Sequence, residues 1–192
     1  MSKFIQLIFL YVRHYQSIQD LVVKEFGEET WLKIIAKSKI DVHEFQNHQV
    51  YDDAYTYRLA GAVSEVLNTD LNTVLKMFGE FWILEISLKK YPSMMASGGL
   101  SFKEFMLNLP NFHNRVYLTY PELVAPEFKV RMDGDAMLVE YHSQRPGLTA
   151  MMEGMLHGIV KMFKEQGVQV LLESEKINSN LDHDLFRITW EK

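Results

Sequence analysis

The sequence predicts an α+β fold, with a helical N-terminal subdomain followed by a subdomain that holds an antiparallel sheet of about four strands and packed helices. Three observations support this fold class. Apolar residues recur at the spacing of one helical face through the first half of the chain. They then alternate with polar residues at Phe128, Val130 and Met132. Asp133-Gly134, between two such runs, is a hairpin turn signal.

Length and composition set broad limits. The chain has 192 residues, of which 47% are apolar, which is enough for one domain over residues 1–192 with a substantial core. We expect the helical subdomain to end at about residue 68 and the sheet-containing subdomain to begin at about residue 69. The net charge of −5, with no basic run, argues against nucleic acid as a partner. The absence of cysteine excludes disulfides, iron–sulfur clusters, thiolate metal ligands and cysteine nucleophiles, and it suits a reducing cytosol.

The N-terminus carries an apolar run over residues 4–11, after Lys3, which hints at a signal peptide. The run is short, no small-residue cleavage site follows it, and Arg13 and His14 interrupt it. It also falls far short of the roughly 20 apolar residues that a membrane helix needs. We read the residues before about Tyr11 as part of the first helix or as a non-native leader, and we expect a cytoplasmic protein without a membrane segment.

Four helical faces can be traced in order through the first half of the chain. Asp52 or Asp53 can cap the third helix, and residues 40–51 before it read as a loop. Thr69 or Asp70 can cap the fourth. The faces are Ile18, Leu21, Val22 and Phe26, ended by Gly27; Trp31, Ile34 and Ile35; Leu59, Ala60, Val63, Val66 and Leu67; and Leu71, Val74, Leu75, Phe78 and Trp82.

Gly79 lies inside the fourth helical face. A glycine in the middle of a helix costs about 1 kcal/mol relative to alanine. Three readings are open: a bend, a close approach to another element, or a tolerated glycine.

Another helix begins at Ser101, because Ser101 and Glu104 form a capping-box pattern. We expect this one helix to lead on to His113. Pro121 and Pro126 then end helical structure, since a proline disfavours helical backbone in the residue before it.

The second half of the chain mixes strands with one helix. Residues 137–143 form the partner strand of the hairpin, and Pro146-Gly147 turns the chain into the helix. Two more strands follow it. The apolar positions are Leu148, Met151, Met152, Met155, Leu156, Ile159 and Phe163 in the helix, Val168, Val170 and Leu172 in the next strand, and Phe186, Ile188 and Trp190 in the last.

The strand over residues 137–143 leads into a group of polar side chains. Tyr141, Ser143 and Arg145 occupy alternate positions, which places them on one side of an extended segment. Two hydroxyl groups and a guanidinium suit a carboxylate, because arginine offers paired N–H groups in the plane that a carboxylate accepts. We call these three residues the carboxylate clamp. Together with His113 on a different element, the clamp suggests heme, with the propionates in the clamp and the iron on the imidazole.

The chain has seven histidines, and His113 by itself would more often be a core or surface residue than a ligand. His142 should face the opposite side of the sheet from Tyr141 and Ser143, because alternate residues of a strand point to opposite faces. His157 lies on an apolar helix, which is typical of a hydrogen-bonded core histidine. Polar neighbours place the others on the surface: His14, His43, His48 and His183.

These features resemble the heme-nitric oxide/oxygen binding (H-NOX) family, which includes the sensor domain of soluble guanylate cyclase. The similarity runs from about residue 20 to the C-terminus. It rests on the segments at residues 26–31, 77–82 and 108–126, the last of which contains His113, and on the spacing Tyr141-x-Ser143-x-Arg145.

The resemblance implies a heme b cofactor between the two subdomains and a role for several residues. His113 resembles the proximal ligand of ferrous heme, and the carboxylate clamp resembles the family's propionate site. Pro126 resembles the proline that presses on the porphyrin and keeps it non-planar. Gly79 resembles the glycine hinge of the helix that moves on signalling. The expected signal is release of His113 on NO binding, followed by relaxation of the heme and the subdomains.

Selectivity among gases depends on donors in the distal pocket, since bound O₂ gains from a hydrogen-bond donor and NO binds ferrous heme without one. O₂-binding family members resemble one another in a distal tyrosine on the helix after the clamp. The corresponding position here is about Met151, and methionine has no donor. Trp82 could also line the pocket and donate from its indole N–H, with plain core packing as its alternative. We therefore expect a sensor that binds NO and CO and excludes O₂.

Other functions compete with this reading. The runner-up is an O₂-binding heme sensor or carrier. A heme peroxidase would need a distal acid/base, usually histidine with arginine, and no such pair stands at a plausible spacing. A heme-free interaction module with an apolar pocket would make the clamp coincidental. The chain shows no kinase, cyclase or nucleotide-binding motif, so we expect no enzyme activity and a signal passed to a partner protein. The resemblance suggests a histidine kinase or a cyclic-nucleotide signalling enzyme as that partner.

Overall fold

The computed structural model describes residues 18–40, 53–119, 126–144, 147–179 and 182–191. The chain divides into two compact units, Met1–Phe78 and Gly79–Lys192. The first unit is helical in its described part, and the second holds a four-stranded antiparallel sheet with packed helices. The predicted α+β fold class is therefore confirmed. Among the described residues, no helix is both long and apolar enough to cross a membrane.

In the described part of the first unit, residues 18–26 are helical, and the helix ends at Gly27, which has a φ of 84°. Helices α2 (Glu28–Ser38) and α3 (Asp53–Leu67) follow and pack against each other. Most of the predicted face positions are buried here, and Ile34 and Leu59 have no exposed surface. Phe26 is 39% exposed, so its place on the buried face is wrong, and Val66 and Leu67 are only half-buried. Most of the loop predicted over residues 40–51 lies outside the described residues.

Helix α4 (Leu71–Phe81) is capped by Asp70, one of the two residues predicted for this role. The Asp70 carboxylate accepts a hydrogen bond from the backbone N–H of Thr73 at 2.9 Å. Val74, Leu75 and Phe78 are buried as expected, whereas Leu71 is 42% exposed and does not belong to the buried face. A first-turn position lies at the end of the element, where fewer neighbours cover it.

Beyond α4 the helix changes type rather than ending. A π-helix, η1 (Trp82–Ser87), leads into α5 (Leu88–Lys90), and α6 (Pro92–Ala96) starts with a proline in its first turn. π-Helical turns are rare and are frequently found at functional sites. The apolar spacing of the sequence did not distinguish this segment from ordinary helix.

The predicted capping box lies at the start of α7 (Phe102–Leu107), where Ser101 Oγ accepts a hydrogen bond from the Glu104 N–H at 3.2 Å. The Glu104 carboxylate accepts from the Leu100 N–H at 3.0 Å. The expectation of one helix reaching His113 is wrong. The chain breaks at Asn108, and a second helix, α8 (Leu109–Thr119), carries His113 with Pro110 in its first turn.

The sheet consists of β1 (Glu127–Asp133), β2 (Ala136–His142), β3 (Val168–Ser174) and β4 (Asp184–Trp190), in the order β1-β2-β4-β3. All pairs are antiparallel. Gly134, with a φ of 61°, and Asp135 form the two-residue hairpin loop between β1 and β2. Helix α9 (Thr149–Met162) follows β2, and the short 3₁₀ helix η2 (Lys176–Asn178) lies between β3 and β4.

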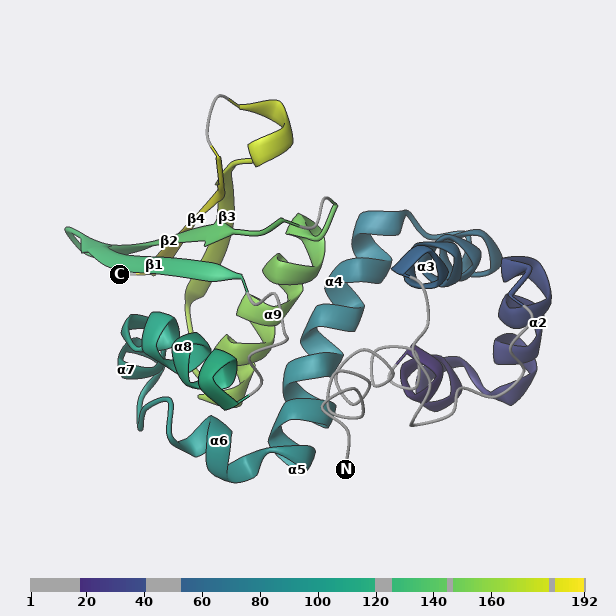
Figure 1. Ribbon diagram of the computed structural model, residues 1–192, viewed down its shortest axis with the longest axis horizontal. Helices are drawn as coiled ribbons and strands as arrows, with labels where there is room; N and C mark the ends of the chain where they lie inside the picture. The colour runs from purple at the N-terminus through teal and green to yellow at the C-terminus, as the bar shows by residue number, and fades with distance from the viewer. Residues whose placement is uncertain (1–17, 41–52, 120–125, 145–146, 180–181, 192) are drawn as a thin grey trace. The chain divides into compact units, whose positions relative to one another are not determined.

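One face of the sheet carries the core of the second unit, with α7, α8 and α9 packed on it (Figure 1). Alternate strand residues point into this core, which explains the alternation seen in the sequence. Its fully buried members include Phe102, Phe105, Met137, Val139, Leu156, Phe186 and Ile188.

Two glycines let the end of α4 and η1 approach α9 closely. A Cβ atom on Gly79 would lie 2.1 Å from the backbone oxygen of Met151, and one on Gly158 would lie 2.8 Å from Cβ of Ile83. Of the three readings open for Gly79, the close approach is thus confirmed. The helix interface explains why this position tolerates no side chain.

Candidate functional site

His113 lies in the second turn of α8 with its ring half-buried. Its Nδ1 atom is 3.1 Å from the backbone oxygen of Leu109, one turn earlier in the same helix. A carbonyl oxygen can only accept, so Nδ1 carries the proton and donates it to Leu109. The other ring nitrogen, Nε2, therefore keeps its lone pair for a ligand. This backbone contact also fixes the orientation of the ring.

The surroundings of His113 favour the neutral ring. Burial lowers the pKa of the His113 imidazole, and the hydrogen bond to Leu109 opposes this only in part. A neutral imidazole is the form that coordinates a metal ion. The residue thus has the tautomer, the charge state and the orientation of a metal ligand.

Phe128 links His113 to the strand that carries the clamp. The rings of His113 and Phe128 have their centroids 4.4 Å apart, and those of Phe128 and Tyr141 lie 5.4 Å apart. Phe128 on β1 stands directly opposite Tyr141 on β2 in the strand register. α8 packs against β1, which brings the imidazole to the same aromatic group. The sequence predicted Phe128 as an apolar position of an alternating strand but not this bridging position, which becomes visible only once the hairpin register is known.

The clamp residues are only partly described. Tyr141 is buried near the end of β2, and Ser143 follows the strand and is half-buried. Arg145 lies outside the described residues. Pro126 directly precedes β1, two residues before Phe128. The structure thus gathers His113, Phe128 and Tyr141 at one end of the β1–β2 hairpin.

Trp82 and Met151 belong to another pair of elements. Trp82 is the first residue of the π-helix η1 and is half-buried, and Met151 is buried in the first turn of α9. η1 packs against α9, with Met151 contributing the backbone oxygen that faces Gly79. Both residues thus lie where the two helices meet within the second unit.

The described donors suit heme chemically. A neutral imidazole with its second nitrogen held by a backbone carbonyl is the usual axial ligand of a histidine-ligated heme iron. The Tyr141 phenol and the Ser143 hydroxyl are groups that can donate to carboxylates, and the Phe128 ring lies between Tyr141 and His113. The residues present therefore fit the group that the sequence predicts.

Comparisons with known proteins agree with this fit. The Haem-NO-binding family matches residues 14–170. Soluble guanylate cyclase 89Db of Drosophila melanogaster is 28% identical over 155 residues, which cover 80% of this chain and 23% of that protein. The rat guanylate cyclase soluble subunit beta-2 is 33% identical over 99 residues, covering 51% of this chain and 14% of the subunit. The chain thus spans less than a quarter of the length of these two cyclases.

Solved structures show the same fold. An H-NOX protein from S. oneidensis in the Fe(II)NO ligation state matches with a TM-score of 0.78 at 19% identity, over 93% of this chain and 98% of that one. The Fe(II) unliganded H-NOX protein from K. algicida matches with a TM-score of 0.78 at 20% identity, over 95% and 97% of the two chains. The chain therefore belongs to the Haem-NO-binding family, as a heme-binding gas-sensor domain related to that of soluble guanylate cyclase.

Proposed function

We propose that this domain senses NO at a ferrous heme b ligated by His113, that it also binds CO, and that it excludes O₂. The observation that carries the proposal is the His113 ring, whose Nδ1–H is held by Leu109 while burial keeps the imidazole neutral. Tyr141, Ser143 and Arg145 bind the propionates in this proposal. Pro126 presses on the porphyrin from the segment before β1.

Selectivity against O₂ follows from the side chains of α9. No tyrosine occurs between Thr149 and Met162, and the buried Met151 has no hydrogen-bond donor. Bound O₂ would therefore receive no hydrogen bond from the side chain at position 151, whereas NO needs none. Trp82 supports the alternative, an O₂ sensor, because this half-buried residue has an indole N–H that could donate a hydrogen bond to O₂.

The response to NO in this proposal starts from the bond between His113 and the heme iron. Ferrous heme, when bound, would supply an iron that takes up NO or CO. His113 would hold that iron from α8, so loss of its bond to the iron would free α8 from the cofactor. Pro126 would contact the porphyrin from the segment before β1. Gly79, which lies against the Met151 backbone without a side chain, serves as the pivot of the helix that moves.

The output is a protein–protein signal. The relatives named above are guanylate cyclases, of which this chain matches less than a quarter. We assign the domain a cytoplasmic partner enzyme, either a histidine kinase or a cyclic-nucleotide signalling enzyme, which reads the change in surface of the gas-bound state. Such a signal shifts populations only by the difference in free energy between the ligation states.

Absorption spectra of the ferrous protein under argon, air, CO and NO test the ligand choice. The proposal expects shifts with CO and NO and the argon spectrum in air before slow oxidation. A stable oxy spectrum in air would instead establish the O₂ sensor. A colourless preparation that takes up no heme would establish the heme-free module.

Replacing the ligand tests the assignment of His113. His113→Gly should lose most of its heme, and free imidazole in the buffer should restore it, because the cavity left by the ring admits the small ligand. His157→Gly, at the half-buried histidine of α9, is the matched control and should keep its heme. Undiminished heme content and an unchanged NO response in His113→Gly would overturn the assignment.

A further inference from the structure

The sheet has a second face, which lies opposite the core face and carries charged and imidazole side chains. Glu140 and His142 point to it from β2, because they alternate with the buried Val139 and Tyr141. His183 immediately precedes β4. β2 pairs with β4 so that Tyr141 stands opposite Asp184, and one further step along the same register brings His142 opposite His183. We call Glu140, His142 and His183 the polar-face triad.

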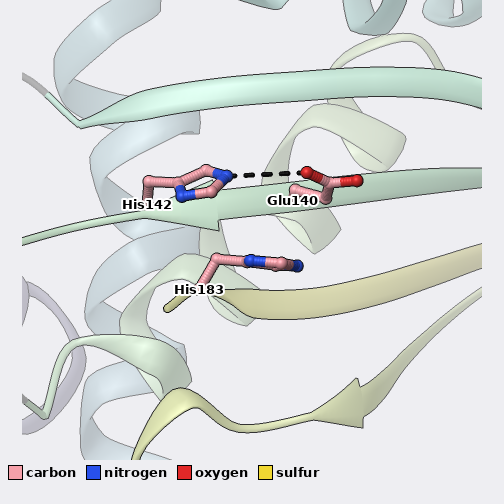
Figure 2. Close-up of side chains that lie close together, drawn as sticks. All are labelled: Glu140, His142 and His183. Carbon is pink, nitrogen blue, oxygen red and sulfur yellow. Dashed lines mark ion pairs between the residues drawn. The ribbon is translucent and has the colours of Figure 1, made fainter. Parts of the chain in front are cut away.

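The three side chains of the triad converge. Figure 2 shows the His142 ring pointing towards the Glu140 carboxylate, with His183 beside them on the neighbouring segment. His142 Nε2 is 3.5 Å from Glu140 Oε2, and the two imidazole rings have their centroids 4.6 Å apart. One ligand atom from each residue lies within 4.8 Å of the other two. All three residues are half-buried, so their positions are constrained by packing.

One nitrogen of His142 lacks a hydrogen-bond partner among the residues that the structure describes. Its Nε2 atom is buried and has no hydrogen-bond partner within the described part of the chain. A buried polar atom without a partner costs about 1–3 kcal/mol, and native structures rarely leave one unexplained. The atom lies 3.5 Å from a Glu140 carboxylate oxygen without forming a hydrogen bond, and a metal ion between the two atoms would bind both.

His183 is already oriented as a metal ligand. Its Nδ1 atom lies 2.8 Å from Asp182 Oδ1, and the carboxylate accepts the hydrogen bond. The same bond holds the pKa of the Asp182 carboxyl below its usual value. A carboxylate behind one ring nitrogen leaves Nε2 of His183 for a metal, which is the usual outer-shell arrangement of zinc histidines. Asp182 Oδ1 is also 3.8 Å from His142 Nδ1, so both rings turn the same edge towards it.

From this geometry we propose that Glu140, His142 and His183 bind a divalent transition-metal ion of the zinc class, independently of heme. Two imidazoles and one carboxylate are a common protein ligand set for zinc, with the fourth position left to water or to a partner's side chain. Ligand atoms around tetrahedral zinc lie about 3.3 Å apart, given metal–ligand distances of about 2.0–2.1 Å. The His142–Glu140 separation of 3.5 Å is close to this value, whereas the ligand atom of His183, which lies within 4.8 Å of the other two, would have to move closer on binding.

Two cations near Glu140 would have to give way. Lys129 Nζ and Arg131 Nη2, both from β1, lie 4.0 and 3.9 Å from the Glu140 carboxylate. Both cationic side chains are more than half exposed, although Glu140 is only 19% exposed, and such long, partly solvated ion pairs contribute little. A divalent ion held by three ligands outweighs them. Tyr141 lies between Glu140 and His142 in the sequence and points to the core face. The metal would therefore link β2, which carries Tyr141, to the start of β4 from the polar face of the sheet.

Zinc titration of the full heme-loaded chain tests the site. The protein is stripped with a chelator, desalted, and titrated with zinc chloride by calorimetry, while bound zinc and iron are measured by elemental analysis. We expect one zinc per chain. His183→Gln and Glu140→Gln should each lower the zinc affinity at least tenfold, because outer-shell losses alone cost about 10–100-fold. Asp182→Asn should lower it by about tenfold for that outer-shell reason.

His157→Gln is the matched control, because it removes an imidazole outside the triad. It should leave the zinc affinity unchanged. Circular dichroism confirms that each variant is folded, and Glu140→Gln, which keeps the side-chain volume, remains informative if a histidine variant unfolds. Wild-type zinc stoichiometry and affinity in both His183→Gln and Glu140→Gln would overturn the proposal. So would the absence of saturable zinc uptake by the wild-type chain.

Discussion

Neighbouring residues of β2 face opposite kinds of surroundings. Val139 and Tyr141 point into the apolar core, where they are 0% and 7% exposed. Glu140 and His142 point to the polar face, where charged side chains from β1 and imidazoles meet. The core face holds its shape through burial and links Tyr141 to His113 through Phe128. The polar face depends on charge, and it leaves one imidazole nitrogen unsatisfied within the described residues. Adjacent residues of β2 therefore belong to two chemically different surfaces, and proximity in the sequence does not show this.

The largest contrast should come from adjacent residues of β4. Phe186 has no exposed surface, and Phe186→Ala should destabilise the chain by about 3–5 kcal/mol, since it removes contacts and leaves a cavity. Arg187 points the other way and pairs with Glu173 and Asp133. Arg187→Gln should cost much less, because all three side chains of these pairs keep contact with solvent and such surface ion pairs contribute little. Urea unfolding at matched heme content measures both. Equal losses would mean that the polar face supports the fold as much as the core does.

Two nearby aspartates should give the next contrast. Asp184 is buried, and its carboxylate accepts hydrogen bonds from Thr149 Oγ1 at 2.8 Å and from the Lys176 N–H at 2.7 Å. It thereby ties the start of α9 and the β3–β4 connection to β4. Asp184→Ala should cost about 1–3 kcal/mol, because two partners lose their acceptor. The side chain of Asp182 is 83% exposed, and Asp182→Ala should leave the unfolding midpoint nearly unchanged. A larger loss in Asp182→Ala than in Asp184→Ala would contradict this ranking.

His113 should stay unprotonated, and able to bind heme, at a lower pH than an exposed histidine would. Burial lowers the pKa of His113, so its Nε2 binds a proton more weakly and more acid is needed to protonate it. The ligand therefore stays available when the pH falls through about 6.5, the ordinary histidine value, and is lost only below it. Soret absorbance of the ferrous protein from pH 8 downwards measures this, with circular dichroism to detect unfolding. Half-loss of heme at or above the ordinary value, in a folded chain, would contradict the prediction.

Local patterns predicted much of this molecule. Alternation at Phe128, Val130 and Met132 predicted β1, and the capping residues Asp70 and Ser101 begin helices. These features depend on contacts within a few residues, so periodicity and capping chemistry are enough to detect them. The fold class followed from their order along the chain. The assignment of His113 as a heme ligand stays a prediction, supported by its tautomer and charge state.

What the sequence missed depends on distant parts of the chain. His183 was expected on the surface, which is wrong, because only 15% of its side chain is exposed and its ring lies against His142. The cause is that β4, not β3, pairs with β2, and a single sequence does not reveal that order. The π-helix from Trp82 was missed for another reason. Its hydrogen bonds skip one more residue, yet its apolar side chains still read as helix.

The smallest expected effect compares Tyr141 with His142 directly. Tyr141→Phe keeps the ring against Phe128 and removes one hydroxyl, and a single hydrogen bond is worth about 1 kcal/mol. Heme should therefore leave about fivefold faster, measured by transfer to an excess of a heme-scavenging globin. Zinc affinity should not change. His142→Gln should show the reverse, with normal heme loss and at least tenfold weaker zinc binding, comparable to the loss of an outer-shell partner. If either variant altered both ligands, the two faces would be coupled through β2, and the strand would have to be treated as one site.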